Sequence, residues 1–270
     1  MAHSFDDALD LTVDDTADGR VRYSGVTPQA YQNMIGPFGG VSAALLAQGL
    51  KRSARDGLKL VSITTDFMSG MKDGPYSLST ICHRAGRSTE FWAANIQQAE
   101  ASSPALRASA VFGETRDTIE WTEGEMPEAP PPEDCAPFVP PRPWAEHIAI
   151  RPCLNTDIFN AKSTRNALWV NFTQPRPLDD IGLVCLADTP TPRVFFVAHE
   201  FTVLSTISMT VYLHASDTDL KDAGSDWILL EANAGRGGNG FYDQHARLWS
   251  RSGKLLATTQ QMVWYKAEKR

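Results

Sequence analysis

The chain shows the same order of hydrophobic patterns twice. Residues 41–50 read Val-Ser-Ala-Ala-Leu-Leu-Ala-Gln-Gly-Leu and are apolar almost all round, with few β-branched residues. This composition predicts a buried helix that begins behind Gly39 and Gly40 and ends at Lys51 and Arg52. The runs that follow are rich in valine, isoleucine and threonine and are separated by turn-forming residues. They predict strands at 58–68, 76–83, 89–98 and 106–112.

The second half repeats this plan. The pattern predicts a strand at 166–175, a helix at 177–187, one long strand or two joined strands over 195–213, and strands at 227–232, 241–250 and 255–265. The polar region before residue 30 is typical of a strand or hairpin. In each half a helix precedes an antiparallel meander, so a parallel doubly wound fold is not expected.

Two similar passages support an internal repeat. Residues 84–91 read Arg-Ala-Gly-Arg-Ser-Thr-Glu-Phe, and residues 233–241 read Asn-Ala-Gly-Arg-Gly-Gly-Asn-Gly-Phe. Leu106 follows Ala85 by 21 residues, and Leu255 follows Ala234 by 21 residues. Two related units in one chain can pack against each other like a dimer, and a ligand site can form at their seam.

The passage from Met126 to Trp144 contains eight prolines. Proline cannot donate to a strand ladder, so this passage is predicted to be an extended linker between the units. We expect an N-terminal unit at 1–118, a proline-rich linker at 119–160 and a C-terminal unit at 161–270.

Composition narrows the class of partner. Of the 270 residues, 42% are hydrophobic and 21% are charged, which is typical of a globular protein. The net charge of −7 argues against nucleic acid as the main partner. We see neither a signal peptide nor an apolar run long enough for a membrane span. The four cysteines lack close pairing or metal spacing, and we expect free thiols and a cytoplasmic protein.

Three passages together carry a family resemblance. Residues 39–50, from Gly39 through the predicted helix, are similar to the first central helix of the acyl-CoA thioesterase II family. Residues 84–89 resemble its Arg-x-Gly-x-Ser turn, and residues 253–261 resemble its closing strand. The resemblance implies an α+β tandem (double) hot-dog fold, with two antiparallel sheets, joined across the seam, that each wrap a central helix. It also implies hydrolysis of acyl-CoA thioesters without a metal or organic cofactor.

The resemblance also implies a site. The family orients a water with an Asp, a Thr and a Gln of the second unit. The Gln falls on Gln261, the Asp falls near Ser208, and the Thr falls near Ala234 or Gly235. A serine at its ordinary pKa cannot act as a general base. Asp66 in the first unit is the reserve base across the seam, or it lies on the solvent face of its strand, which is the simpler interpretation.

The residues themselves suggest further candidates. The amides of Gly39 and Gly40 at the helix start can stabilise an oxyanion, or the glycines can serve only close helix–sheet packing. Gln261 lies 149 residues after the apolar Phe112, and it either orients water or faces outward on its strand. Asp179 and Asp180 are expected mainly as caps of the second helix.

Substrate contacts are expected from three more residues. Asn33 can hydrogen-bond a carbonyl or only shape the loop before the helix. Arg87 and Arg236 can contact CoA phosphates, although ordinary turn arginines are the simpler interpretation. His199, Glu200 and His214 are further acid/base candidates, although a lone histidine near a strand end is usually structural.

The expected function is therefore an acyl-CoA thioesterase. Its alternative is a non-catalytic acyl-CoA or lipid-binding protein that keeps the tunnel without the chemistry. A hot-dog dehydratase is a weaker third choice, because no Asp/His hydratase signature is visible. The carrier (CoA or acyl carrier protein), the acyl chain length and the formation of a homo-oligomer stay open.

Overall fold

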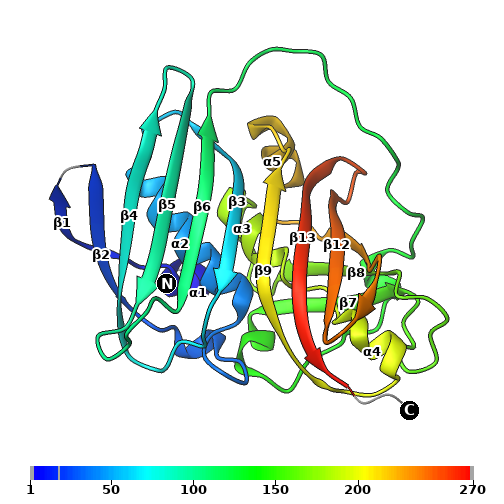
Figure 1. Cartoon of the computed structure of the whole chain (residues 1–270). Coiled ribbons are helices and arrows are strands. Elements are labelled where there is room, and N and C mark those ends of the chain that lie inside the picture. The colour runs from blue at the N-terminus through cyan, green and yellow to red at the C-terminus, as the bar shows by residue number, and fades with distance from the viewer. Residues whose placement is uncertain (1–2, 18, 268–270) are drawn as a thin grey trace.

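The computed structural model describes residues 3–17 and 19–267 and contains one continuous antiparallel sheet. Its strands lie in the order β1-β2-β4-β5-β6-β3-β9-β13-β12-β10-β8-β7 (Figure 1). The first half of the sheet contains β1 (Thr12–Ala17), β2 (Arg20–Val26), β3 (Lys59–Phe67), β4 (Pro75–Ala85), β5 (Thr89–Gln97) and β6 (Leu106–Gly113). The second half contains β7 (Ile148–Leu154), β8 (Asn166–Phe172), β9 (Val203–Leu213), β10 (Ile228–Asn233), β12 (Phe241–Ser250) and β13 (Leu255–Lys266), and the short β11 (Gly237–Gly238) pairs with β12.

The main helices are α2 (Gly39–Ser53) and α3 (Asp180–Leu186), which lie side by side against one face of this sheet (Figure 1). They are antiparallel. Lys51 near the end of α2 is 3.9 Å from the carboxylate of Asp180 at the start of α3. The shorter elements are α1 (Ser4–Ala8), α4 (Arg193–Ala198) and α5 (Asp217–Ala223), with single turns η1 (Gln29–Tyr31), η2 (Pro132–Asp134) and η3 (Pro143–Glu146).

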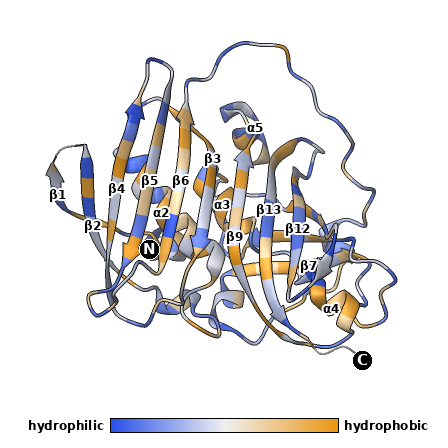
Figure 2. Ribbon diagram, viewed as in Figure 1, coloured by the Kyte–Doolittle hydropathy of each residue, from blue (hydrophilic) through white to orange (hydrophobic). Residues whose placement is uncertain are grey.

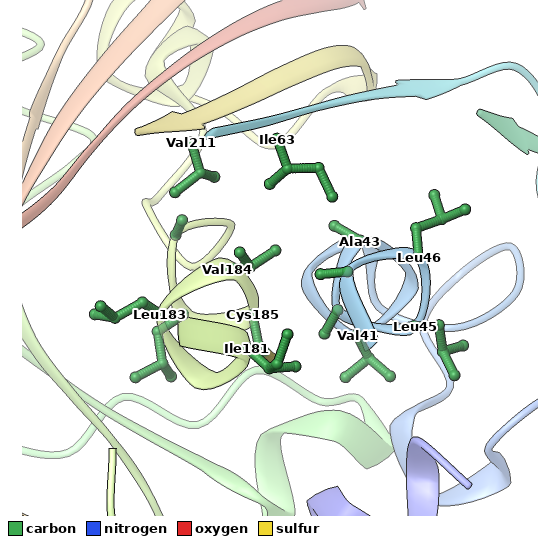
Figure 3. Close-up of a cluster of buried hydrophobic side chains, with 14 of the residues drawn as sticks. Val41, Ala43, Leu45, Leu46, Ile63, Ile181, Leu183, Val184, Cys185 and Val211 are labelled. Carbon is green, nitrogen blue, oxygen red and sulfur yellow. The ribbon is translucent and has the colours of Figure 1, made fainter. Parts of the chain in front are cut away.

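The core forms between these helices and the sheet. Figure 3 shows Val41 and Leu46 of α2, Val184 of α3, and Ile63 and Val211 of the two central strands gathered in one cluster. All five side chains are fully buried or nearly so. Along the strands, hydrophobic and hydrophilic residues alternate (Figure 2), because only one face of the sheet meets the helices.

The internal repeat is visible in the way that the strands pair. The central strands β3 and β9 pair antiparallel, with Thr64 opposite Thr210. In the first half Leu60 pairs with Phe112, and in the second half Met209 pairs with Gln261. Both members of the second pair lie 149 residues after their counterparts. The two halves are therefore related by an approximate two-fold axis at the β3–β9 pair, and equivalent turns lie at opposite ends of the sheet.

One predicted strand is wrong in part. Residues 195–202 were expected to be extended, but α4 covers Arg193–Ala198 and β9 begins only at Val203. A short apolar run cannot be assigned to helix or strand by its period alone, and Pro192 before the run favours a helix start. The helices α1 and α5 were not predicted; α5 begins at a capping box formed by Ser216 and Asp219.

The proline-rich passage packs against the outer face of the second half. Trp169 Nε1 donates to the carbonyl oxygen of Pro130 at 2.9 Å, and Cys135 packs with Trp169 and Trp249. The strand β7 lies inside the range 119–160 that was expected to be a linker. Among the described residues, no helix is long and apolar enough to cross a membrane.

Candidate active site

Gln261 is the centre of a buried polar cluster on the inner face of the sheet. It lies on β13 and is 5% exposed. Its Nε2 donates to Asp188 Oδ1 at 3.1 Å, and its Oε1 accepts from Thr206 Oγ1 at 3.2 Å. Its Nε2 also lies 3.4 Å from Met209 Sδ. The cluster therefore joins the segment after α3, the strand β9 and the strand β13.

A β-bulge places Thr206 in this cluster. Met262 pairs with Ser208, but the next residue, Val263, pairs with Thr206, so that Ile207 is the extra residue. With regular pairing Ile207 would lie opposite Val263, and Thr206 would point to the other face. The bulge instead turns Thr206 towards Gln261, which is the kind of re-aiming that bulges give near functional sites.

Asp188 lies against the start of α2. It follows α3 by two residues, and its carboxylate accepts a hydrogen bond from the backbone N–H of Gly40. A Cβ on Gly39 would lie 2.5 Å from Asp188 Oδ2, and a Cβ on Gly40 would lie 2.2 Å from the carbonyl oxygen of Cys185. Both glycines are therefore needed for this close approach of the two helices.

Burial raises the pKa of Asp188 to about 7, although hydrogen bonds from Gln261 and from the Gly40 amide act in the opposite direction. A carboxyl group with a pKa near neutrality exchanges a proton readily under physiological conditions, as a general base requires. A strongly perturbed carboxyl beside a specific polar partner is a functional-site candidate.

The structure brings Gln261, Gly39 and Gly40 to one place, but it does not bring Ser208 or Asp66 there. Ser208 pairs with Met262 and with Asp66, and these three lie on the outer face, opposite to Gln261 and Met209. The carboxylate of Asp66 instead binds Arg107 at 3.2 Å. The cause is the two-residue period of a strand, which places Ser208 and Gln261 on different faces.

The two glycine amides that were expected to bind an oxyanion differ in their hydrogen bonds. The Gly40 amide is already bonded to Asp188, while no described group accepts a hydrogen bond from the Gly39 amide. Asn33 lies on the exposed loop before α2, where its backbone N–H donates to Gly36 O at 2.8 Å.

The two arginines lie at different ends of the molecule. Arg55, just after α2, donates to the carbonyl oxygen of Arg87 at 2.8 Å. Arg87 is thus separated from Gly39 by the whole of α2, roughly 22 Å at 1.5 Å per residue. Arg236 lies in the turn before β12, where its backbone N–H donates to Asp243 Oδ1 at 2.7 Å. Both side chains are exposed.

The remaining acid/base candidates lie elsewhere. Asp179 is the N-cap of α3, accepting from Gly182 N at 2.7 Å, as expected. His214 lies 3.0 Å from Thr258 Oγ1, and burial lowers its pKa. His199 is exposed after α4 and has a left-handed φ of 56°.

Sequence reasoning missed Asp188 and Thr206. Asp188 stands in a short turn, Ala-Asp-Thr-Pro, directly after the buried second helix. A carboxylate next to the end of an apolar helix is the sequence feature that could have identified Asp188 as a site residue. Thr206 carries no such signal, because its direction depends on the bulge at Ile207.

The first half holds no copy of this cluster at the matching positions. Phe112 stands where the second half has Gln261, and Ala110 stands where it has Thr259. Among the described residues, the polar cluster is therefore present in the second half, and apolar residues occupy the pseudo-equivalent positions in the first half.

Comparisons with known proteins agree with this architecture. A model of the acyl-CoA thioesterase N-terminal domain matches residues 27–113, and a model of the acyl-CoA thioesterase C-terminal domain matches residues 124–265. A hot dog fold protein of unknown function from Alicyclobacillus acidocaldarius is similar at 32% identity, with a TM-score of 0.91 and 100% of both chains covered.

An acyl-CoA thioesterase II from Mycobacterium marinum has a TM-score of 0.73 at 17% identity, covering 98% of this chain and 99% of that chain. At that identity the likeness shows a shared fold. A search of curated proteins finds no match. The tandem hot-dog architecture inferred from the sequence is confirmed.

Proposed function

The chain belongs to the acyl-CoA thioesterase family, and from that premise we propose that it hydrolyses an acyl-CoA thioester with water. The observation that carries the proposal is the hydrogen-bonded cluster of Asp188, Gln261 and Thr206 at the start of α2. Its residue types are the Asp, Gln and Thr that the family resemblance implies. Asp188 and Thr206 take the roles that the sequence alone assigned near Ser208 and Ala234.

In this proposal Asp188 is the general base. Water attacks the thioester carbonyl carbon, and its proton passes to the Asp188 carboxylate. The Gln261 amide holds Asp188 Oδ1, and Thr206 fixes the orientation of that amide through Oε1. The geometry of the base is thus set before substrate arrives, which reduces the cost of alignment in the transition state.

The start of α2 supplies the electrostatic stabilisation of the transition state. The Gly39 amide donates to the oxyanion that develops on the carbonyl oxygen, assisted by the positive end of the helix dipole. When the C–S bond breaks, protonated Asp188 returns its proton to the CoA thiolate. The products are a carboxylic acid and free CoA thiol, and no cofactor enters the reaction.

The alternative is a non-catalytic acyl-CoA or lipid binder. It rested on the apparent loss of the family's Asp and Thr, and the position of Asp188 and Thr206 beside Gln261 favours hydrolysis. The proposal also places this reaction in the cytoplasm. It allows a homo-oligomer, and light scattering after size-exclusion chromatography measures the oligomeric state.

The test is thiol release from acyl-CoAs of increasing chain length. The wild type is expected to release thiol, while Asp188→Asn and Gln261→Ala lose turnover and keep acyl-CoA binding. Tight acyl-CoA binding by the wild type without thiol release for any chain length would support the binder instead.

A further inference from the structure

Two buried polar atoms beside Gln261 have no hydrogen-bond partner among the described residues. They are Gln244 Oε1 and Thr259 Oγ1. Gln244 is 4% exposed and Thr259 is 2% exposed. A buried polar group without a partner costs stability, and native proteins satisfy most such groups with a protein partner or with ordered water.

The strand register places both groups around Gln261 on the inner face. Gln244 on β12 pairs directly with Gln261 on β13, and Thr259 precedes Gln261 by two residues on the same face. Gln244 and Thr259 are diagonal neighbours on adjacent strands, about 7–8 Å apart, a span that a glutamine side chain and one water can bridge.

Packing alone does not require the hydroxyl at position 259. The pseudo-equivalent residue in the first half is Ala110. Ala110 pairs with Ile63 in the same way that Thr259 pairs with Val211. Ala110 is 4% exposed and sits in the apolar core. The second half therefore carries a buried hydroxyl where an alanine fits the same fold.

We propose that Gln244 and Thr259 bind an internal water next to Gln261. Water suits both groups, since it donates to an amide oxygen and either donates to or accepts from a hydroxyl. If hydrolysis proceeds as proposed above, each turnover consumes one water. The bound water then refills the attack position beside Asp188, and this second role rests on the proposed function.

The site itself is tested on the folded protein without any substrate. A high-resolution crystal structure is expected to show a water within about 3 Å of Thr259 Oγ1 and of the Gln244 side chain. Thr259→Val keeps the shape but removes the hydroxyl, and its Tm is expected to fall by about 2–4 °C. Thr259→Ser is expected to keep both the water and the Tm.

A dry site gives the opposite result. Removing an unpartnered hydroxyl from a dry core raises Tm, so a higher Tm for Thr259→Val together with no water density overturns the proposal.

The supply role is tested by kinetics. Thr259→Val is expected to lower kcat about tenfold with KM unchanged, and Thr259→Ser to restore kcat. Thr65→Val is the matched control, because its buried hydroxyl is also unpartnered but Met209 separates it from Gln261.

An unchanged kcat in Thr259→Val overturns the supply role. If the wild type hydrolyses no thioester, the proposed function fails, while the crystallographic water and the Tm still decide the water site.

Discussion

Gln261 Nε2 lies 3.1 Å from Asp188 Oδ1, although the two residues are 73 positions apart in the chain. The contact ties the last strand of the sheet to the turn after α3, at the point where α2 begins. Burial at this junction raises the pKa of Asp188 to about 7.

The rate of thioester hydrolysis should rise with pH through about 7. The base must be ionised to accept a proton from water, and the pKa of Asp188 places this ionisation near neutrality. The measurement is kcat/KM for a short acyl-CoA between pH 5 and pH 8. A profile that is flat over this range would show that Asp188 does not control the rate.

Asp188→Asn should lower kcat by roughly 10²–10⁴, since the amide cannot accept the proton. The same variant should be more stable than the wild type at pH 8. The folded-state pKa lies above the unfolded value of about 3.9, so the wild type loses stability as pH rises from about 4 through 7.

The expected gain at pH 8 is on the order of 2–4 kcal/mol and should vanish below about pH 4. Urea unfolding of both proteins at pH 4 and pH 8 measures it. A variant that is less stable at pH 8 would contradict the raised pKa.

Thr206→Val should lower kcat about tenfold, because the isosteric valine cannot donate to Gln261 Oε1. Ser208→Ala is the matched control on the same strand, since Ser208 faces outward and pairs with Met262. Steady-state kinetics on both variants measures the difference. Equal effects of the two substitutions would count against the inward position of Thr206.

The two glycines of α2 should respond differently to alanine. At Gly39 the new Cβ meets the carboxylate end of Asp188, so the main effect is a displaced base and a lower kcat. At Gly40 the new Cβ meets the backbone carbonyl of Cys185, which cannot move without α3. Gly40→Ala should therefore cost about 2–3 kcal/mol of stability. Thermal unfolding and kinetics on both variants separate the two effects.

Arg236→Ala should raise KM for acyl-CoA a few fold at low salt, and Arg87→Ala should not. Arg236 lies directly before β11, at the end of the sheet where β13 finishes, five residues beyond Gln261. Arg87 lies at the opposite end of α2 from Gly39. Phosphate contacts at the surface weaken with salt, so KM measured at two ionic strengths tests the assignment.

Several elements could be read from local patterns. Strand 241–250 matches β12 (Phe241–Ser250), and strand 106–112 ends one residue before β6 does. Successive side chains of a strand point to opposite faces, so buried and exposed positions alternate and the strand can be recognised from the local sequence. The run at 195–202 failed because its apolar residues suit a helix as well as a strand.

The sequence by itself determined the two helix-and-meander units, their repeat and the strand that carries Gln261, since these depend on periodic burial and on spacing. It left open the face of the strand on which Gln261 lies. Only the tertiary structure decided which groups meet that glutamine. Asp188 reaches it because the antiparallel α2 and α3 bring a helix end under the sheet, and Thr206 reaches it because Ile207 forms a bulge. Ser208 is excluded because it pairs regularly with Met262 and so lies on the face opposite to Gln261. Contacts between distant segments depend on packing and register, and a single extra residue reverses the face of a strand.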